Sequence, residues 1–287
     1  MVRHYNDSLA PIVFLHGFGS TKEDYADIAH HTTFIGRPFV AYDMPGCGET
    51  FCHDLSQISI SFLVNTARAI LRELGIKRFH LVGHSMGGLV ALILAHQAQD
   101  QVLSFINIKG NVAPEDCFLS RQIFTHPSDD PEAILTTLLG SKHESIRDID
   151  ISVLVRDEDK GDPEGFFSAF IERTRRSPFY ASPLYASSLR SKVRVGAVRG
   201  IFESMVNLSD HGDLMFKFIS LPCPRLFMYG EQNASLTYLN YLDVNGVELA
   251  EIPQSGHFPM YSNPAEMWMR ISNFIKRSEL LVGEVAI

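Results

Sequence analysis

Short, largely apolar runs that end in glycine-bearing turns recur along this chain of 287 residues, and they constrain its fold more than any other feature. Unbroken apolar runs of this length are typical of parallel strands that are buried on both faces. We therefore predict strands over 11–15, 38–42, 79–82, 103–108, 225–229 and 247–252.

Helical patterns separate these runs. Over 59–74, Leu63, Ala67 and Leu71 recur at the spacing that places them on one helix face. A second helix is expected directly after Ser85 and a third after Asn263. Because strands and helices alternate, the sequence predicts an α/β fold with an open, mostly parallel sheet flanked by helices.

The stretch 112–220 interrupts this alternation. It contains helix starts at Asp130 and Asp162 but no convincing core strand. We interpret 1–111 and 221–287 as the core and 112–220 as a helical cap over the carboxyl edge of the sheet, where open α/β sheets bind ligands. The phenylalanines of this cap could line an apolar pocket or hold the cap to the core: Phe118, Phe124, Phe166, Phe167, Phe170 and Phe179.

Composition excludes several function classes. The chain has 25 basic and 33 acidic residues, a formal net charge of −8, so a nucleic-acid-binding surface is not expected. Its four cysteines and its histidines show no metal-ligand spacing, and we expect no metal or other cofactor. The first ten residues carry no apolar signal segment, and no apolar run is long enough to span a membrane. A cytoplasmic protein is the expectation.

The segment Gly83-His84-Ser85-Met86-Gly87 is a G-x-S-x-G pattern between a predicted strand and a predicted helix. A nucleophilic serine has to project from a tight turn there, and flanking glycines leave out the Cβ atoms that would clash. The following helix directs free N–H groups at the same point, where they can stabilise an oxyanion. Ser85 is therefore the expected nucleophile, with the N–H of Met86 as one oxyanion donor. A glycine-rich turn that only packs helix on sheet is the alternative.

Two further segments complete this candidate site. His16-Gly17-Phe18-Gly19 follows the first predicted strand, where the N–H of Phe18 can supply the second oxyanion donor. His257 lies between the last predicted strand and the last helix, so its imidazole could reach Ser85 as general base. Phe18 and His84 are expected to border the substrate.

This combination resembles the α/β-hydrolase fold family, in its capped, serine-esterase-like branch. The resemblance rests on the His16-Gly17 loop, 43–48, the segment around Ser85 and Ser255-Gly256-His257, and it covers nearly the whole chain. It implies acyl transfer through a serine ester that water then hydrolyses. Because the apolar run at 11–15 comes so early, the N-terminal strands of the family are expected to be truncated. A partner, such as a second copy in a homodimer, could cover that sheet edge.

The acid that should orient the histidine is not evident. The position that the resemblance assigns to an aspartate holds Asn233, and an alternative position one strand earlier holds Lys109. Glu231 is the first candidate because it is only two residues away and has a longer side chain. Asp116 and Asn233 stay open, and a carboxylate would have to neutralise Lys109 before an imidazolium could form beside it.

We expect a cofactor-independent serine hydrolase acting on a small or medium apolar carboxylic ester or lactone. Thioester and carbon–carbon bond hydrolysis use the same groups. A ligand-binding or regulatory protein that kept the fold and lost most of its turnover is the rival hypothesis. Asn233 and Lys109 favour that rival, whereas Ser85 and His257 favour the enzyme.

Overall fold

A computed structural model describes residues 1–3, 9–124 and 163–285. Six parallel strands form the centre of its sheet, each within two residues of a predicted run, which confirms the strand predictions. They are β2 Ile12–Leu15, β3 Phe39–Ala41, β4 Phe79–His84, β5 Val102–Ile108, β6 Arg225–Gly230 and β7 Glu248–Ile252.

The sheet has the strand order β1-β3-β2-β4-β5-β6-β7. β1, Val2–Arg3, pairs antiparallel with β3, and the amino group of Met1 donates to the carbonyl oxygen of Ala41 at 2.5 Å. The chain's own first residues thus pair with β3 at the sheet edge that a second copy of the chain was expected to cover. A homodimer stays a prediction.

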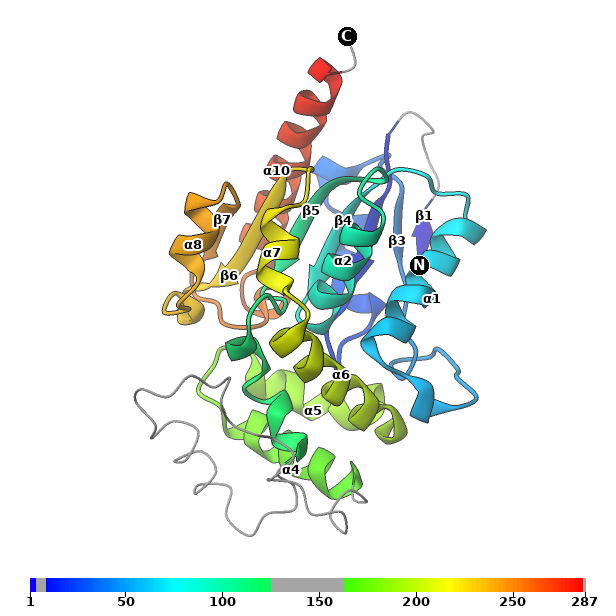
Figure 1. Cartoon of the computed structure of the whole chain (residues 1–287), viewed down its shortest axis with the longest axis vertical. Helices are drawn as coiled ribbons and strands as arrows, with labels where there is room; N and C mark the ends of the chain where they lie inside the picture. Colours follow the sequence, from blue (N-terminus) through cyan, green and yellow to red (C-terminus); the bar gives the residue numbers. More distant parts are fainter. Residues whose placement is uncertain (4–8, 125–162, 286–287) are drawn as a thin grey trace.

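Helices cover both faces of the sheet (Figure 1). α1 (Ile60–Glu73), α2 (Met86–Gln97) and α7 (Leu214–Ile219) form one layer, in which α2 contacts both of the others. α10 (Pro264–Val285) lies against the opposite face, where the rings of Trp268 and Phe14 meet edge to face with centroids 5.8 Å apart. The predicted helices after residues 59, 85 and 263 are confirmed.

Between β5 and β6 the described residues are helical and add no strand to the sheet. They gather mainly at one end of it (Figure 1). Besides α7, these elements are η4 Pro114–Cys117, η5 Ser120–Phe124, α4 Pro163–Arg176, α5 Ser182–Lys192, η9 Val195–Ala197 and α6 Val198–His211. The helix start predicted at Asp130, the residue Asp162 and the side chain of Phe124 lie outside the described part.

The cap phenylalanines divide into two groups. Phe166, Phe167 and Phe170 of α4 are buried, whereas Phe118 and Phe179 are about two-fifths exposed. The remaining short elements connect strands: η1 Lys22–Ala29, η2 Thr32–Phe34, η3 Leu55–Gln57, η10 Glu231–Asn233, α8 Leu239–Val244 and α9 Pro259–Ser262. None of the helices in the described ranges is long and apolar enough to cross a membrane.

Candidate active site

Ser85 occupies the sharp turn between β4 and α2. Its backbone has φ 53° and ψ −122°, a conformation that residues with a Cβ rarely adopt. The Ser85 N–H donates to the carbonyl oxygen of Ile108 at 3.0 Å, which ties the turn to the end of β5. Its side chain stays partly exposed between buried neighbours. The serine therefore projects from a strained, fixed turn, as the sequence predicts.

The glycines on either side of Ser85 permit this turn. A Cβ on Gly83 would lie 2.4 Å from the carbonyl oxygen of Gly87, and one on Gly87 would lie 2.2 Å from the carbonyl oxygen of Leu15. Both distances are far below van der Waals contact, and the opposing atoms belong to the backbone. The close approach expected of these glycines is confirmed.

The loop after β2 lies directly against Ser85. A Cβ on Gly17 would come within 2.7 Å of His84 Nδ1 and 3.1 Å of Ser85 Cβ. His16 holds this loop: its Nδ1 donates to the Gly17 carbonyl oxygen at 2.8 Å, and its Nε2 accepts from the Met44 N–H at 2.8 Å. Burial lowers the pKa of His16, so the ring stays neutral and keeps this tautomer.

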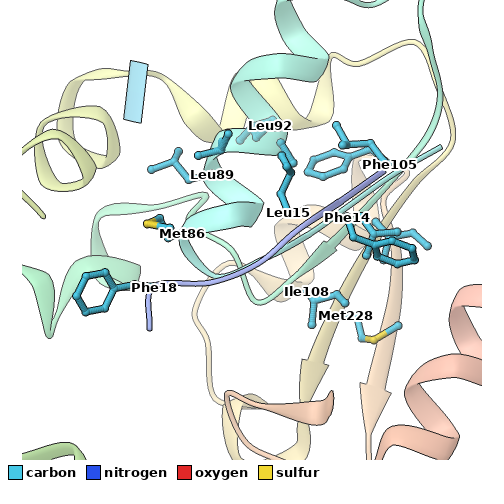
Figure 2. Packing of buried hydrophobic residues seen from close by; sticks show 14 of the residues in the cluster. Phe14, Leu15, Phe18, Met86, Leu89, Leu92, Phe105, Ile108 and Met228 are labelled. Carbon is cyan, nitrogen blue, oxygen red and sulfur yellow. The ribbon is translucent and has the colours of Figure 1, made fainter. Parts of the chain in front are cut away.

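The two expected oxyanion donors are available. Among the described residues, neither the N–H of Phe18 nor that of Met86 donates to a protein acceptor. The Gly17 carbonyl faces His16, so the N–H on the other side of that trans peptide points the opposite way. Figure 2 shows Phe18 at one end of the buried cluster, beyond Met86. The Phe18 ring packs on Phe167, Phe170 and Phe202 of the cap.

His257 lies in the loop between β7 and α9, tied to the residue before Ser85. His84 Nε2 donates to the His257 carbonyl oxygen at 2.7 Å, and the two imidazole centroids are 5.0 Å apart. Burial lowers the pKa of His84 to about 4, so His84 is neutral. In the described part of the chain no hydrogen bond joins the Ser85 hydroxyl to the His257 ring, although such bonds often tighten only with substrate bound.

Electrostatics disfavour a charged His257. Desolvation holds the pKa of His257 well below its usual range, and the neighbouring side chains of His84 and Lys109 lower it further. The imidazole of His257 is thus unprotonated at neutral pH and able to accept a proton. None of the groups that shift this pKa is a carboxylate.

Glu231, the first candidate for the acid, is used elsewhere. Its Oε2 accepts from the Gln254 N–H at 2.7 Å, and its side chain is exposed. In this position the carboxylate binds the turn before His257, and among the described residues no hydrogen bond joins it to the imidazole. The sequence could not show this contact, because the partner of Glu231 is a backbone N–H in the loop after β7.

Asp116, the second candidate, is occupied by four donors. Its Oδ1 accepts from Lys109 Nζ at 2.5 Å and from the Tyr238 hydroxyl at 2.7 Å. Its Oδ2 accepts from the N–H groups of Val112 and Ala113 at 2.9 and 3.0 Å. This buried carboxylate therefore neutralises Lys109, which is the condition for an imidazolium to form beside the lysine.

Asn233, the third candidate, has a buried side-chain oxygen without a donor among the described residues. It ends η10, which is bound to the loop of His257: the Gln232 N–H donates to the Ser255 carbonyl oxygen at 3.1 Å. A buried acceptor without a donor costs free energy. A hydrogen-bond donor brought to this oxygen would remove that cost.

A cap residue that sequence reasoning missed also reaches this site. The hydroxyl of Tyr185, in α5, donates to the Phe18 carbonyl oxygen across 167 positions of sequence. A lone tyrosine in an insertion carries no signal that could have revealed this contact. No group of three or more His, Cys, Asp or Glu that could hold a metal ion occurs in the described ranges.

Comparison with known proteins decides the family. The sequence model of the alpha/beta hydrolase family matches residues 12–268. The chain belongs to this family. An esterase of Mycobacterium tuberculosis is 32% identical over 98 residues, which cover 34% of this chain and 32% of that protein. Other relatives are named lipase or hydrolase.

Solved structures show the same fold. An esterase of Thermogutta terrifontis has a TM-score of 0.66 and 17% identity, with 97% of this chain and 92% of that chain covered. An N-acyl homoserine lactonase mutant complexed with N-hexanoyl homoserine has a TM-score of 0.63 and 18% identity, with coverages of 96% and 92%. The matches to the first curated relatives span only 25–32% of those proteins. The family's fold is consistent with carboxylic ester hydrolysis.

Proposed function

We propose that this protein is a serine hydrolase that cleaves a small or medium apolar carboxylic ester or lactone. The observation that carries the proposal is the pair of N–H groups, of Phe18 and Met86, that have no acceptor among the described residues and lie next to a serine held in a strained, partly exposed turn. Donors fixed in advance around a nucleophile are what acyl transfer requires.

The reaction follows from these positions. The Ser85 hydroxyl oxygen attacks the ester carbonyl carbon while its proton passes to His257, which is uncharged because of its lowered pKa. The N–H groups of Phe18 and Met86 hold the oxyanion of the tetrahedral intermediate. The carbon–oxygen bond to the alcohol then breaks, and His257 returns the proton to the leaving oxygen. Water repeats these steps on the acyl-serine and releases the acid.

The surroundings of the serine support an uncharged, apolar acyl group. Phe18 and its cap partners Phe167, Phe170 and Phe202 bring aromatic rings to the loop beside Ser85. Lys109, a cation whose charge acts on His257, is already paired with Asp116 and cannot bind a substrate carboxylate without breaking a buried ion pair. Thioester or carbon–carbon bond cleavage would need the same groups.

A covalent probe tests this function directly. We expect one fluorophosphonate molecule to bind covalently to each wild-type chain, as the mass of the intact protein would show. Peptide mapping should place the adduct on Ser85. Ser85→Ala should not be labelled, whereas Ser187→Ala, a change of an exposed cap serine, should be labelled like the wild type. Labelling that persists in Ser85→Ala would refute the assignment.

The lowered pKa of His257 favours a second candidate function, a ligand-binding protein with little turnover. Burial, and after it His84 and Lys109, disfavour a protonated His257, and proton acceptance is the step that turnover requires. A wild-type protein that binds an apolar ester but is not labelled by the fluorophosphonate would support this alternative.

We further propose that Asn233 takes the place of the triad carboxylate and accepts a hydrogen bond from the His257 ring. Three observations support it: its buried oxygen lacks a donor, its element η10 is bound to the loop of His257, and the carboxylates of Glu231 and Asp116 are engaged elsewhere. An amide orients the imidazole without stabilising the imidazolium.

Asn233→Asp should therefore raise kcat for a p-nitrophenyl ester by about tenfold or more, because a carboxylate stabilises the imidazolium that forms in the transition state. Asn233→Leu should lower kcat, since it removes the acceptor. Asn245→Asp, the same change at an exposed asparagine, should leave kcat unchanged. The assignment is wrong if Glu231→Gln lowers kcat strongly while Asn233→Leu does not.

A further inference from the structure

Helix α5 of the cap reaches the loops of the proposed site through the side chain of Tyr185. The Tyr185 hydroxyl donates to the Phe18 carbonyl oxygen. Its ring stacks on Phe258 with centroids 4.3 Å apart and planes inclined by 29°. Phe258 directly follows the proposed base, His257, and their rings meet edge to face at 4.9 Å. A single buried side chain thus contacts both the loop of the oxyanion donor and the loop of the base.

The backbone of the oxyanion loop is fitted to this helix. Gly19 has φ +71°, and a Cβ there would lie 2.1 Å from Leu189 Cδ2 and 2.6 Å from the Tyr185 hydroxyl oxygen. Residues 18–19 therefore lie flush against α5, with no space for a side chain at position 19. Burial raises the pKa of Tyr185 well above its usual value, so its hydroxyl keeps the proton it donates.

Backbone contacts on both sides fix α5 to the core. After the helix, the Gly48 N–H donates to the Lys192 carbonyl oxygen at 2.7 Å and the Arg194 N–H donates to that of Gly46 at 2.9 Å. Before it, the Tyr180 N–H donates to Gln232 Oε1 at 2.8 Å. The tyrosine therefore sits on a helix held at each end, which can keep a loop in one position.

The two peptide groups on either side of the Phe18 Cα each have a carbonyl oxygen that accepts a hydrogen bond. His16 Nδ1 and the Ser20 N–H donate to the Gly17 carbonyl oxygen, at 2.8 and 3.2 Å, and Tyr185 donates to that of Phe18. With both carbonyls bound, the orientation of the intervening Phe18 N–H is fixed. Without the Tyr185 hydroxyl, the Phe18–Gly19 peptide would lose this donor, and the Phe18 Cα, which joins it to the peptide that carries the Phe18 N–H, would be held from one side only.

We propose that Tyr185 is a positioning residue of the cap, whose hydroxyl fixes the peptide that follows the Phe18 oxyanion donor and so sets the turnover rate of the core. This inference rests on the proposed hydrolase function. It assigns to the cap a part in the chemical step and not only in substrate binding. The expected signature is a loss in kcat and in the affinity for transition-state analogues, with little change in KM, because the bond acts on the oxyanion donor.

Tyr185→Phe tests this, because it keeps the ring on Phe258 and removes only the hydroxyl. With p-nitrophenyl butyrate we expect kcat to fall about tenfold or more, with KM within twofold of the wild type. The inhibition constant of butylboronic acid, which forms a tetrahedral adduct with a nucleophilic serine, should rise by a similar factor. Binding of butyrate, the product acid, should change little.

Tyr261→Phe is the matched control. It also removes a partly buried hydroxyl from this aromatic stack, but that hydroxyl donates to Asp24 Oδ1 at 2.6 Å and not to the carbonyl oxygen of Phe18. If the two variants lower kcat and boronate affinity equally, or if Tyr185→Phe changes neither, the proposal is overturned. Should Tyr185→Phe be too unstable to assay, Tyr185→Met, which also lacks the hydroxyl, gives the same comparison.

The labelling experiment separates this inference from the function on which it rests. A wild-type protein that the fluorophosphonate does not label at Ser85 would refute the hydrolase function. A labelled wild type together with an unaffected Tyr185→Phe would refute only the role of Tyr185.

Discussion

Replacing His257 with alanine should lower kcat for a p-nitrophenyl ester by about a thousandfold or more while the protein stays folded. A serine hydroxyl is a weak nucleophile, and it attacks only when a nearby base takes its proton. When residues act as one catalytic unit, replacing either of them removes most of the rate enhancement, so the effects of two replacements do not add. The double variant Ser85→Ala/His257→Ala should therefore be little slower than either single variant, as steady-state kinetics would show.

His53→Ala is the control for this prediction, because His53 is exposed and its ring packs against that of Phe51. It should keep wild-type kcat. A His257→Ala variant with more than about a tenth of wild-type kcat would mean that another group is the base, since a true base contributes at least a hundredfold.

The pH profile gives an independent check of His257. Its pKa lies well below 6.5 because burial, His84 and Lys109 all disfavour the protonated ring. A base with a lowered pKa stays unprotonated as the pH falls, so the acidic limb of kcat/KM should lie below pH 6.5. An acidic limb above that value would show that a carboxylate acts on the ring, which the described residues do not indicate.

The sequence predicted the sheet and the turn around Ser85 because both depend on local patterns. Apolar runs identify strands buried on both faces, and Gly83 and Gly87 identify the point where helix and strands meet within van der Waals distance. Such signals are carried by neighbouring residues. They need no knowledge of which distant segments meet.

The acid could not be predicted because its identity depends on contacts between distant residues. The sequence places Glu231 and Asp116 after strands that end near the site, so both are candidates. In the structure Glu231 binds the Gln254 N–H, and Asp116 binds Lys109 and Tyr238. The part of Tyr185 was hidden for the same reason, since its partner lies 167 positions away. Hydrogen-bond partners between such segments leave no pattern in one sequence.

Gly87→Ala should have the largest effect on stability, because the new methyl group would lie 2.2 Å from the Leu15 carbonyl oxygen and 2.4 Å from that of His16. Both atoms are backbone at the end of β2, so the clash can be relieved only by moving α2 away from the sheet. We expect the free energy of unfolding to fall by about 3 kcal/mol or more, a large part of the stability of an ordinary domain.

Gly246→Ala separates this clash from the general cost of removing a glycine. Gly246 has φ +77°, and the nearest atom to its new methyl group is 3.7 Å away, at Arg225. Only the left-handed backbone penalises this change, by about 1 kcal/mol. Urea unfolding of both variants, followed by circular dichroism, should therefore give a much lower midpoint for Gly87→Ala. Equal midpoints would mean that α2 can move off the sheet at little cost, and the turn would then not hold Ser85 rigidly enough to keep its hydroxyl beside the Phe18 and Met86 amides.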